Sequence, residues 1–196
     1  PSGNSSVMLD CAAGFHPRYS PFYLRRVRIS AADPLCEVLR RAGIDMVPEV
    51  NQGGDSGIPV STLVASFPIA SPPGSMTRHD ETALEQLDRY RRIMETWCGE
   101  RGHNQSATVY VGDDEWDGVR EWVWTHFDTV TGLSFLPRDG GAYPLAPYEE
   151  IDEATYLRLA AEVPEVDWSI LAEVEREDMT EGAQTLACTG GSCELV

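Results

Sequence analysis

Hydrophobic and polar residues follow recognisable periods over most of the chain, and these periods predict its elements. Residues 15–21, rich in Pro and polar side chains, indicate a loop, and residues 23–29 alternate in a way that favours a β-strand. A helix should follow, because Asp33 is a good N-cap, Pro34 suits the first helical position and Gly43 is a typical helix stop.

The middle of the chain indicates a strand–helix–strand–helix–strand run. Short apolar segments at residues 62–69, 107–111 and 132–136 predict three strands, and a Pro/Gly-rich break follows the first of them. Such a run predicts parallel strands with right-handed crossovers. The pattern is compatible with half of a doubly wound sheet and with a sector of a barrel.

Two helices are predicted between these strands. The first should open at Thr77, with Asp80 three residues on, much as in a capping box. Its apolar stripe comprises Leu84, Leu87, Tyr90, Ile93, Met94 and Trp97. The second should cover residues 113–127 and bury one face, which comprises Trp116, Val119, Val123 and Phe127. The tryptophans, which lie mostly on these helices, are expected in a core or an interface.

The chain changes character after residue 137. Prolines and glycines up to Pro147 predict a long loop, and residues 151–161 predict a short helix with Asp152 near its start. From about Glu173 the sequence is acidic and rich in small residues, which favours a mobile tail. We therefore expect one domain over residues 1–170 and a tail over residues 171–196.

Composition narrows the classes of partner. The 196 residues, 42% of them hydrophobic, suffice for one compact domain. A net charge of −17 repels phosphate backbones and anionic lipid, so neither a nucleic-acid polymer nor a membrane is expected as a partner. Arginines gather in the first 41 residues, where they could face a small anion or a partner.

Five cysteines with wide spacing indicate reduced thiols and a cytoplasmic location. Cys36 and Cys98 lie in helical patterns and are expected to act as small apolar residues, whereas Cys11 lies in a loop. Cys188 and Cys193 flank two glycines near the end of the chain, where a tight turn could bring them to disulfide distance. They are either a redox-active dithiol on a flexible arm or two incidental surface thiols. No histidine grouping indicates a metal site.

The first residues form a small polar segment. Ser2, Gly3, Asn4 and Ser5 offer backbone N–H groups and hydroxyls that suit phosphate oxygens. Serine- and glycine-rich ends are more often simply disordered, and the segment by itself leaves both interpretations open.

Several segments taken together resemble one family, the adenosylcobalamin-dependent (class II) ribonucleotide reductases, and specifically their C-terminal portion. The Pro1-Ser2-Gly3 start resembles the family's loop for the substrate phosphate, and the closing Cys188-Thr189-Gly190-Gly191-Ser192-Cys193 resembles its mobile cysteine pair. Between these ends, similar motifs occur in order at residues 15–28, 67–75, 133–138 and 145–150.

The resemblance implies an α/β fold, namely the C-terminal part of a ten-stranded α/β barrel with a flexible, cysteine-bearing tail. It implies reduction of ribonucleotides through a thiyl radical that adenosylcobalamin initiates. Ser2, Gly3, Asn4 and Ser5 would bind the substrate phosphate, although Asn4 stands where the family usually has Thr. Cys188 and Cys193 would re-reduce the active-site disulfide and be regenerated by a thioredoxin-like reductant.

The family's other catalytic groups lie upstream of its phosphate loop, and Cys11 matches none of them. The resemblance therefore implies a further N-terminal part of the reductase as a partner, which would bind most of the adenosylcobalamin, and inactivity without that part. The alternative is a non-catalytic thiol-redox or binding module derived from the same fold.

A chain with only part of a barrel exposes unpaired strand edges, which tend to pair with other chains. We therefore expect the isolated chain to self-associate or to be poorly soluble unless the upstream part is present. Light scattering measures this directly, and a monodisperse monomer at high concentration would contradict the expectation.

Overall fold

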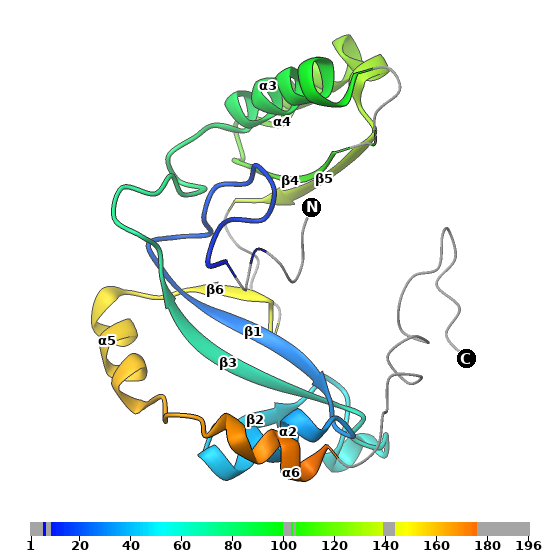
Figure 1. The fold of residues 1–196 in the computed structure, drawn as a ribbon. Coiled ribbons are helices and arrows are strands. Elements are labelled where there is room, and N and C mark those ends of the chain that lie inside the picture. The colour runs from blue at the N-terminus through cyan, green and yellow to red at the C-terminus, as the bar shows by residue number, and fades with distance from the viewer. Residues whose placement is uncertain (1–5, 7–8, 100–102, 104, 139–143, 176–196) are drawn as a thin grey trace. The chain divides into compact units, whose positions relative to one another are not determined.

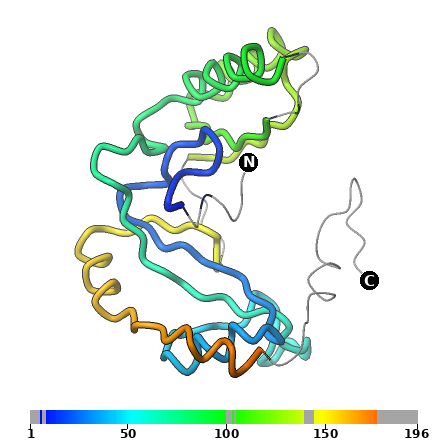
Figure 2. The backbone as a smooth tube through the Cα atoms, in the orientation of Figure 1, coloured from blue at the N-terminus to red at the C-terminus, as the bar shows by residue number. Residues whose placement is uncertain are grey.

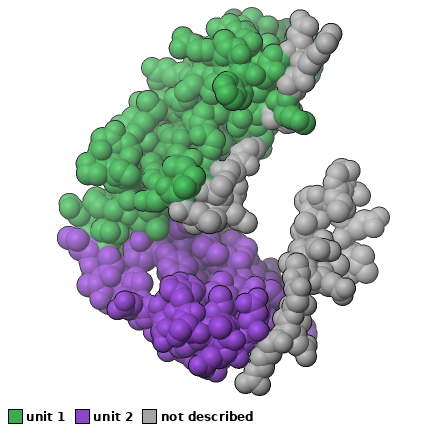
Figure 3. Space-filling model, in the orientation of Figure 1, with its two compact units in different colours: residues 1–23, 69–143, 148–156 green, residues 24–68, 144–147, 157–196 purple. Residues whose placement is uncertain are grey.

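The structure, a computed structural model, describes residue 6 and residues 9–99, 103, 105–138 and 144–175. The chain is divided into two compact units (Figure 3). Unit 1 comprises residues 1–23, 69–143 and 148–156, and unit 2 comprises residues 24–68, 144–147 and 157–196. The chain passes repeatedly from one unit to the other. Figure 2 shows the course of the backbone, coloured by residue number.

The described elements alternate between strands and helices (Figure 1). The strands are β1 (Phe22–Ser30), β2 (Met46–Pro48), β3 (Thr62–Ala70), β4 (Ser106–Val111), β5 (Gly132–Pro137) and β6 (Tyr148–Glu150). The α-helices are α2 (Pro34–Ala42), α3 (Ala83–Ile93), α4 (Trp116–Thr125), α5 (Glu153–Glu162) and α6 (Leu171–Val174). The predicted α/β character is confirmed, and no described helix is long and apolar enough to cross a bilayer.

The strand at β1 and the helix α2 agree with the sequence prediction. The Asp33 side chain accepts a hydrogen bond from the backbone N–H of Leu35, and Pro34 occupies the first turn. Gly43 ends the helix with a φ of 86°, in the left-handed region that glycine adopts without a steric penalty. Both ends of α2 are thus set by local residues.

The predicted start of α3 was wrong by one and a half turns. The helix begins at Ala83, because Thr82 and Glu85 form a reciprocal capping box. Thr77 and Asp80 make a similar motif in a separate turn, in which the Asp80 carboxylate accepts hydrogen bonds from the backbone N–H and hydroxyl of Thr77, both at 2.7 Å. The sequence contains two capping signals, and the second one opens the helix.

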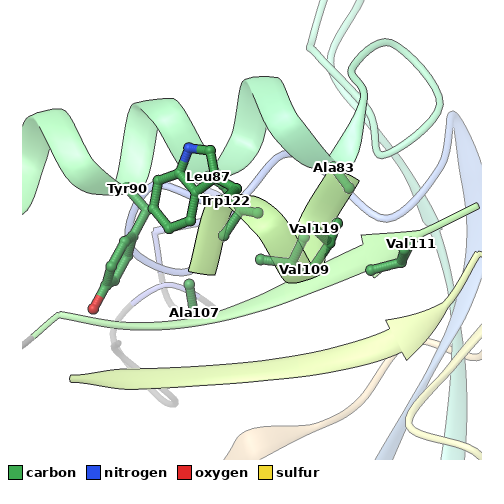
Figure 4. Packing of buried hydrophobic residues seen from close by; sticks show 8 residues of the cluster. All are labelled: Ala83, Leu87, Tyr90, Ala107, Val109, Val111, Val119 and Trp122. Atoms are coloured by element: carbon green, nitrogen blue, oxygen red, sulfur yellow. The ribbon is translucent and has the colours of Figure 1, made fainter. Parts of the chain in front are cut away.

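The buried face of α3 also differs from the predicted stripe. Leu87 and Tyr90 are fully buried as expected, together with Ala83, and they pack on β4 (Figure 4). Leu84 is 39% exposed and Trp97 is 87% exposed. Trp97 lies in the π-helical segment Met94–Cys98 that follows α3, where the wider turn shifts side chains away from the α-helical face.

The helix α4 is shorter than predicted, and its predicted face is confirmed in part, because Val119 is buried and Val123 packs against the core. Val119 and Trp122 point toward α3 and β4 and are buried (Figure 4). Trp116 and Phe127, which were expected in the core, are 41% and 67% exposed. Among the five tryptophans only Trp122 is buried, and the others, Trp97, Trp116, Trp124 and Trp168, are exposed.

The topology confirms only half of the predicted βαβαβ run. Among the described residues, β4 and β5 form a parallel pair joined by α4, in a register that sets Val109 opposite Phe135. In contrast, β3 belongs to a second sheet with the order β2-β3-β1-β6, where it pairs antiparallel with β2. Since β3 has neighbours on both edges, it has no free edge for β4, and α3 does not make a parallel crossover between them.

The second unit has its own small core. Ile29 on β1, Cys36 and Leu39 on α2, and Ala65 on β3 are buried together. Burial raises the pKa of the Cys36 thiol, and the nearby Asp33 charge raises it further, so this thiol stays protonated. The expectation that Cys36 acts as a small apolar core residue is confirmed.

The C-terminal part adds elements that the pattern did not predict: the three-residue strand β6, a 3-10 helix over Trp168–Ile170 and the short helix α6, which lies at the start of the predicted tail. The predicted short helix is confirmed as α5, and the Asp152 side chain accepts a hydrogen bond from the N–H of Thr155 at its start. The helix α6 ends at Val174. Most of the predicted tail, residues 176–196, lies outside the described residues.

Leu87→Ala should lower the free energy of unfolding by about 2–5 kcal/mol, because it leaves a cavity beneath α3. Leu84→Ala, on the exposed side of the same helix, is the matched control and should cost less than about 1 kcal/mol. Urea denaturation followed by circular dichroism measures both. Equal losses in the two variants would contradict the assigned buried face.

Candidate functional site

Most of the residues that the sequence singled out lie outside the described part of the chain. This holds for Ser2, Gly3, Asn4 and Ser5 of the candidate phosphate loop and for the cysteine pair, Cys188 and Cys193. The structure therefore describes the surroundings of the candidate loop, which are residue 6 and the segment that follows it, and it leaves the roles of the six residues as predictions.

The segment that follows the loop is attached to the rest of unit 1 through Arg18. Its guanidinium forms an ion pair with Asp10 at 3.0 Å and also donates to the Asp10 carbonyl oxygen. Its backbone N–H donates to the carbonyl oxygen of Met76, and its carbonyl oxygen accepts from the N–H of Arg78. Burial opposes the charge on Arg18, while hydrogen bonds with Tyr23 and Asp10 raise its pKa, so the residue is a buried, paired cation.

A backbone hydrogen bond connects this segment to the buried residue next to the candidate loop. The N–H of Cys11 donates to the carbonyl oxygen of Ser6 at 2.9 Å, and the Ser6 residue is 5% exposed. Asp10, between them, has a φ of 45°, an unusual backbone conformation that aspartate tolerates better than most residues. The Cys11 thiol itself is exposed.

His16 fixes the same segment to the edge of β4. The backbone N–H of Thr108 donates to His16 Nε2 at 3.0 Å, so Nε2 carries no proton. His16 Nδ1 lies 2.6 Å from the carbonyl oxygen of Ala13 and therefore donates the ring's single proton to it. Phe15 lies close to the ring of Tyr90 on α3. The sequence prediction found no role for His16, and its role here is to hold the segment in place.

A cluster of aromatic rings also holds this segment against the rest of unit 1. The ring of Tyr19 stacks on Tyr148 at 5.3 Å and meets Tyr110 of β4 edge-on at 6.2 Å. The guanidinium carbon of Arg78 lies 3.8 Å from the centre of the Tyr19 ring. Arg78 is 5% exposed, and its Nε and Nη1 have no hydrogen-bond partner among the described residues, so the aromatic rings compensate part of its desolvation.

The charge of Arg78 is balanced by Glu150 at the end of β6. Arg78 Nη2 donates to the Glu150 carboxylate at 2.9 Å, and His79 Nε2 lies 2.8 Å from the same oxygen. Partial burial works in the opposite direction, but the hydrogen bonds from His79 and Arg78 hold the pKa of Glu150 below its ordinary value. No local pattern in the sequence marks this group, because about seventy positions separate Arg78 and His79 from Glu150.

The carboxyl ends of β4 and β5 are closed by a second ion pair. Arg138, just beyond β5, donates to the Glu115 carboxylate at 2.7 Å. The same carboxylate accepts from the N–H groups of Gly112 at 2.7 Å and Ala83 at 2.9 Å. The sequence predicted a polar loop at this strand end, a common place for a site in α/β folds. The described contacts make Arg138 a structural residue.

Within the described part of unit 1, no helix covers one face of the β4–β5 pair. Ala107, Val109 and Val111 are buried beneath the helices, and strand alternation sends the residues between them to the other side. There the register sets Thr108 opposite Ser134 and Tyr110 opposite Leu136. Among the described residues no three His, Cys, Asp or Glu side chains are placed to hold a metal ion.

Comparison with known proteins gives a consistent result over the whole chain. It is 30% identical to an adenosylcobalamin-dependent ribonucleoside-triphosphate reductase of Euglena gracilis over 98% of its own length and 25% of that protein. A reductase of the same description from Levilactobacillus brevis is 24% identical, and a probable one from Dictyostelium discoideum is 27% identical, each over 100% of the chain. The chain thus spans about a quarter of the length of the curated relatives it matches.

A solved structure shares the fold. A crystal structure of a B12-dependent (class II) ribonucleotide reductase superposes with a TM-score of 0.66 over 90% of this chain and 24% of that one, at 22% identity. No protein-family model matches the chain.

The free energy of unfolding should fall in acid, in part because Glu150 becomes protonated. A carboxyl whose pKa is lowered by folding stabilises the protein fully above its unfolded pKa of about 4.3, and this contribution is lost as the pH falls through the folded value. Glu150→Gln should therefore flatten the loss of unfolding free energy between about pH 6 and pH 3, measured with urea. The control Glu165→Gln removes an exposed carboxyl and should leave the slope unchanged. Identical acid profiles for Glu150→Gln and the wild type would disprove the assigned ion pair.

Proposed function

We propose a function on the premise that this chain is homologous, over its whole length, to the adenosylcobalamin-dependent (class II) ribonucleotide reductases. The chain is the C-terminal portion of such an enzyme, which converts ribonucleotides to deoxyribonucleotides, and it is inactive without the remainder. The observation that carries this proposal is the match of 98–100% of the chain to relatives that all have the same description. Ordered motifs along the sequence agree with it.

The first role of the chain in this reaction is to hold the substrate phosphate through Ser2, Gly3, Asn4 and Ser5. Backbone N–H groups and serine hydroxyls suit the oxygens of a phosphate. The well-attached segment that follows the loop supports the role, because Arg18 and His16 fix its backbone against unit 1. A loop whose base is held in this way loses less conformational freedom when the ligand binds.

The second role is electron delivery by the dithiol Cys188 and Cys193. Reduction of a ribose 2′ position consumes two thiols of the active site and leaves a disulfide. The tail thiolate attacks that disulfide, the second tail thiol completes the exchange, and the tail cysteines become a disulfide while the active-site thiols are restored. A thioredoxin-like dithiol then reduces the tail. The described cysteines, Cys11, Cys36 and Cys98, are free thiols, so none of them forms a second dithiol pair.

The described residues do not form a site for adenosylcobalamin by themselves. No three His, Cys, Asp or Glu side chains in the described part of the chain lie together as metal ligands, and the chain spans a quarter of its relatives' length. We therefore assign most of the cofactor's contacts to the remainder of the enzyme. The same remainder would complete the ten-stranded barrel to which β4 and β5 belong.

Reconstitution tests the proposal. The chain is mixed with the polypeptide that supplies the other three quarters of the reductase, adenosylcobalamin, a ribonucleotide and thioredoxin, and deoxyribonucleotide formation is followed. Activity should require this chain. Cys188→Ser should lose activity by at least about tenfold with thioredoxin and recover it with a small dithiol that reaches the active site directly.

Cys98→Ser is the matched control and should behave as the wild type, because Cys98 has no place in the exchange. Activity that is unchanged when the chain is omitted would refute the reductase assignment and favour a non-catalytic thiol module. A Cys188→Ser variant as active with thioredoxin as the wild type would refute the role of the tail while leaving the assignment intact.

A further inference from the structure

One peptide group lies between the buried guanidinium of Arg18 and the residue next to the candidate phosphate loop. This is the peptide that joins Asp10 to Cys11. Its carbonyl oxygen accepts a hydrogen bond from Arg18 Nη2, and its N–H donates to the carbonyl oxygen of Ser6 at 2.9 Å. Two consecutive hydrogen bonds therefore connect Arg18 to Ser6, which directly follows the loop at residues 2–5.

Both ends of this connection are held by the rest of unit 1. The Arg18 side chain is 9% exposed, and its Nη1 forms the 3.0 Å ion pair with the Asp10 carboxylate. The backbone N–H of Arg18 donates to the carbonyl oxygen of Met76, and its carbonyl oxygen accepts from the N–H of Arg78. At the other end, Ser6 is buried. The peptide between them is therefore held from both sides.

The backbone at Asp10 depends on such support. Its φ of 45° lies in the left-handed region, which a residue with a Cβ adopts only at a cost in free energy, so other turns compete with this one. The planar fork of a guanidinium suits the task of selecting it, because separate nitrogens reach the carboxylate and the carbonyl oxygen of the same residue. A lysine ammonium is a single point of charge and has no such fork.

We propose that Arg18 is a positioning residue for the substrate: through the Asp10–Cys11 peptide it holds the candidate loop in the conformation that binds the phosphate of the ribonucleotide. A cation on the carbonyl oxygen polarises the peptide and strengthens the N–H donor that faces Ser6. A loop that is ordered beforehand loses less conformational freedom when its ligand binds. Both terminal nitrogens of Arg18 are engaged by Asp10, so Arg18 acts through the loop and is not itself a phosphate ligand. This inference rests on the proposed function and adds to it a residue that sets the affinity for the phosphate.

The test is a kinetic comparison of Arg18→Lys with the wild type in the reconstituted reductase. The variant keeps the charge and loses the fork, so KM for the ribonucleotide should rise at least about fivefold, while kcat should change by less than about twofold. Arg120→Lys is the matched control, because Arg120 also lies in unit 1 but is 81% exposed and pairs with Asp117 at the surface. It should have the KM of the wild type.

Equilibrium binding separates positioning of the phosphate loop from a general distortion of the site. Calorimetry on the complex without adenosylcobalamin measures the dissociation constants of inorganic pyrophosphate and of a ribonucleoside that has no phosphate. Arg18→Lys should weaken pyrophosphate binding by about the same factor as it raises KM, and it should leave the ribonucleoside unaffected. Equal weakening of both ligands would overturn the proposal, as would a fall in kcat at unchanged KM.

A second variant keeps the test decisive if the buried substitution prevents folding, which urea denaturation reveals. Asp10→Ala removes the carboxylate that Arg18 Nη1 holds, and the Asp10 side chain is 71% exposed, so the fold should tolerate the change. Alanine also adopts the left-handed backbone less readily than aspartate. The KM should again rise, by at least about threefold, without a matching loss of kcat. A folded Asp10→Ala variant with the KM of the wild type would refute the positioning role.

The two proposals can fail separately. If the wild-type complex is active and both Arg18→Lys and Asp10→Ala have the KM of the wild type, the role of Arg18 is wrong and the proposed function stands. If the wild-type chain does not restore activity to the remainder of the reductase, both fail.

Discussion

A single carboxylate connects the four elements of unit 1 that make the β4–β5 layer. Glu115 stands just before α4, and it accepts hydrogen bonds from the N–H of Ala83 at the start of α3 and from the N–H of Gly112 at the end of β4. It also forms the ion pair with Arg138 beyond β5. A negative charge is favourable at the start of α3, where backbone N–H groups are unpaired. The core of Leu87, Tyr90 and Val109 is held beneath helices whose ends this group fixes (Figure 4).

The elements that the sequence predicted well are those whose limits are local. α2 lies between Asp33 and Gly43, and both residues act on the backbone within a few positions. The start of α3 could not be chosen locally, because Thr77 and Thr82 both carry a suitable acidic partner three residues on. The position of β3 depends on which strands occupy its edges, and that is decided by segments such as β1 and β2 far along the chain. A pattern of alternating elements contains no information on this competition.

In the candidate site, too, local features could be predicted from the sequence and non-local contacts could not. The sequence motifs named the loop residues and the cysteine pair by resemblance, whereas the supporting contacts are non-local and have no sequence signal. His16 reaches Thr108 across 92 positions, and Arg78 reaches Glu150 across 72. Positive charge inside unit 1 is consistently compensated, by Asp10 for Arg18 and by Glu150 and the Tyr19 ring for Arg78. The described residues that follow the candidate loop are therefore held by buried contacts whose charges are compensated.

The side chains that occupy the outer edge of β4 also limit how copies of the chain can polymerise through this sheet. An open-ended filament needs two complementary edges on every subunit, so that each copy can bind one neighbour ahead and one behind. His16 and Gln86 fill hydrogen-bonding positions on β4, whereas no described residue makes a hydrogen bond to the outer edge of β5. Addition of further copies to the β4–β5 sheet therefore stops once two copies have paired through their β5 edges. Copies of the chain can therefore pair through this layer, but they cannot extend into fibres through it.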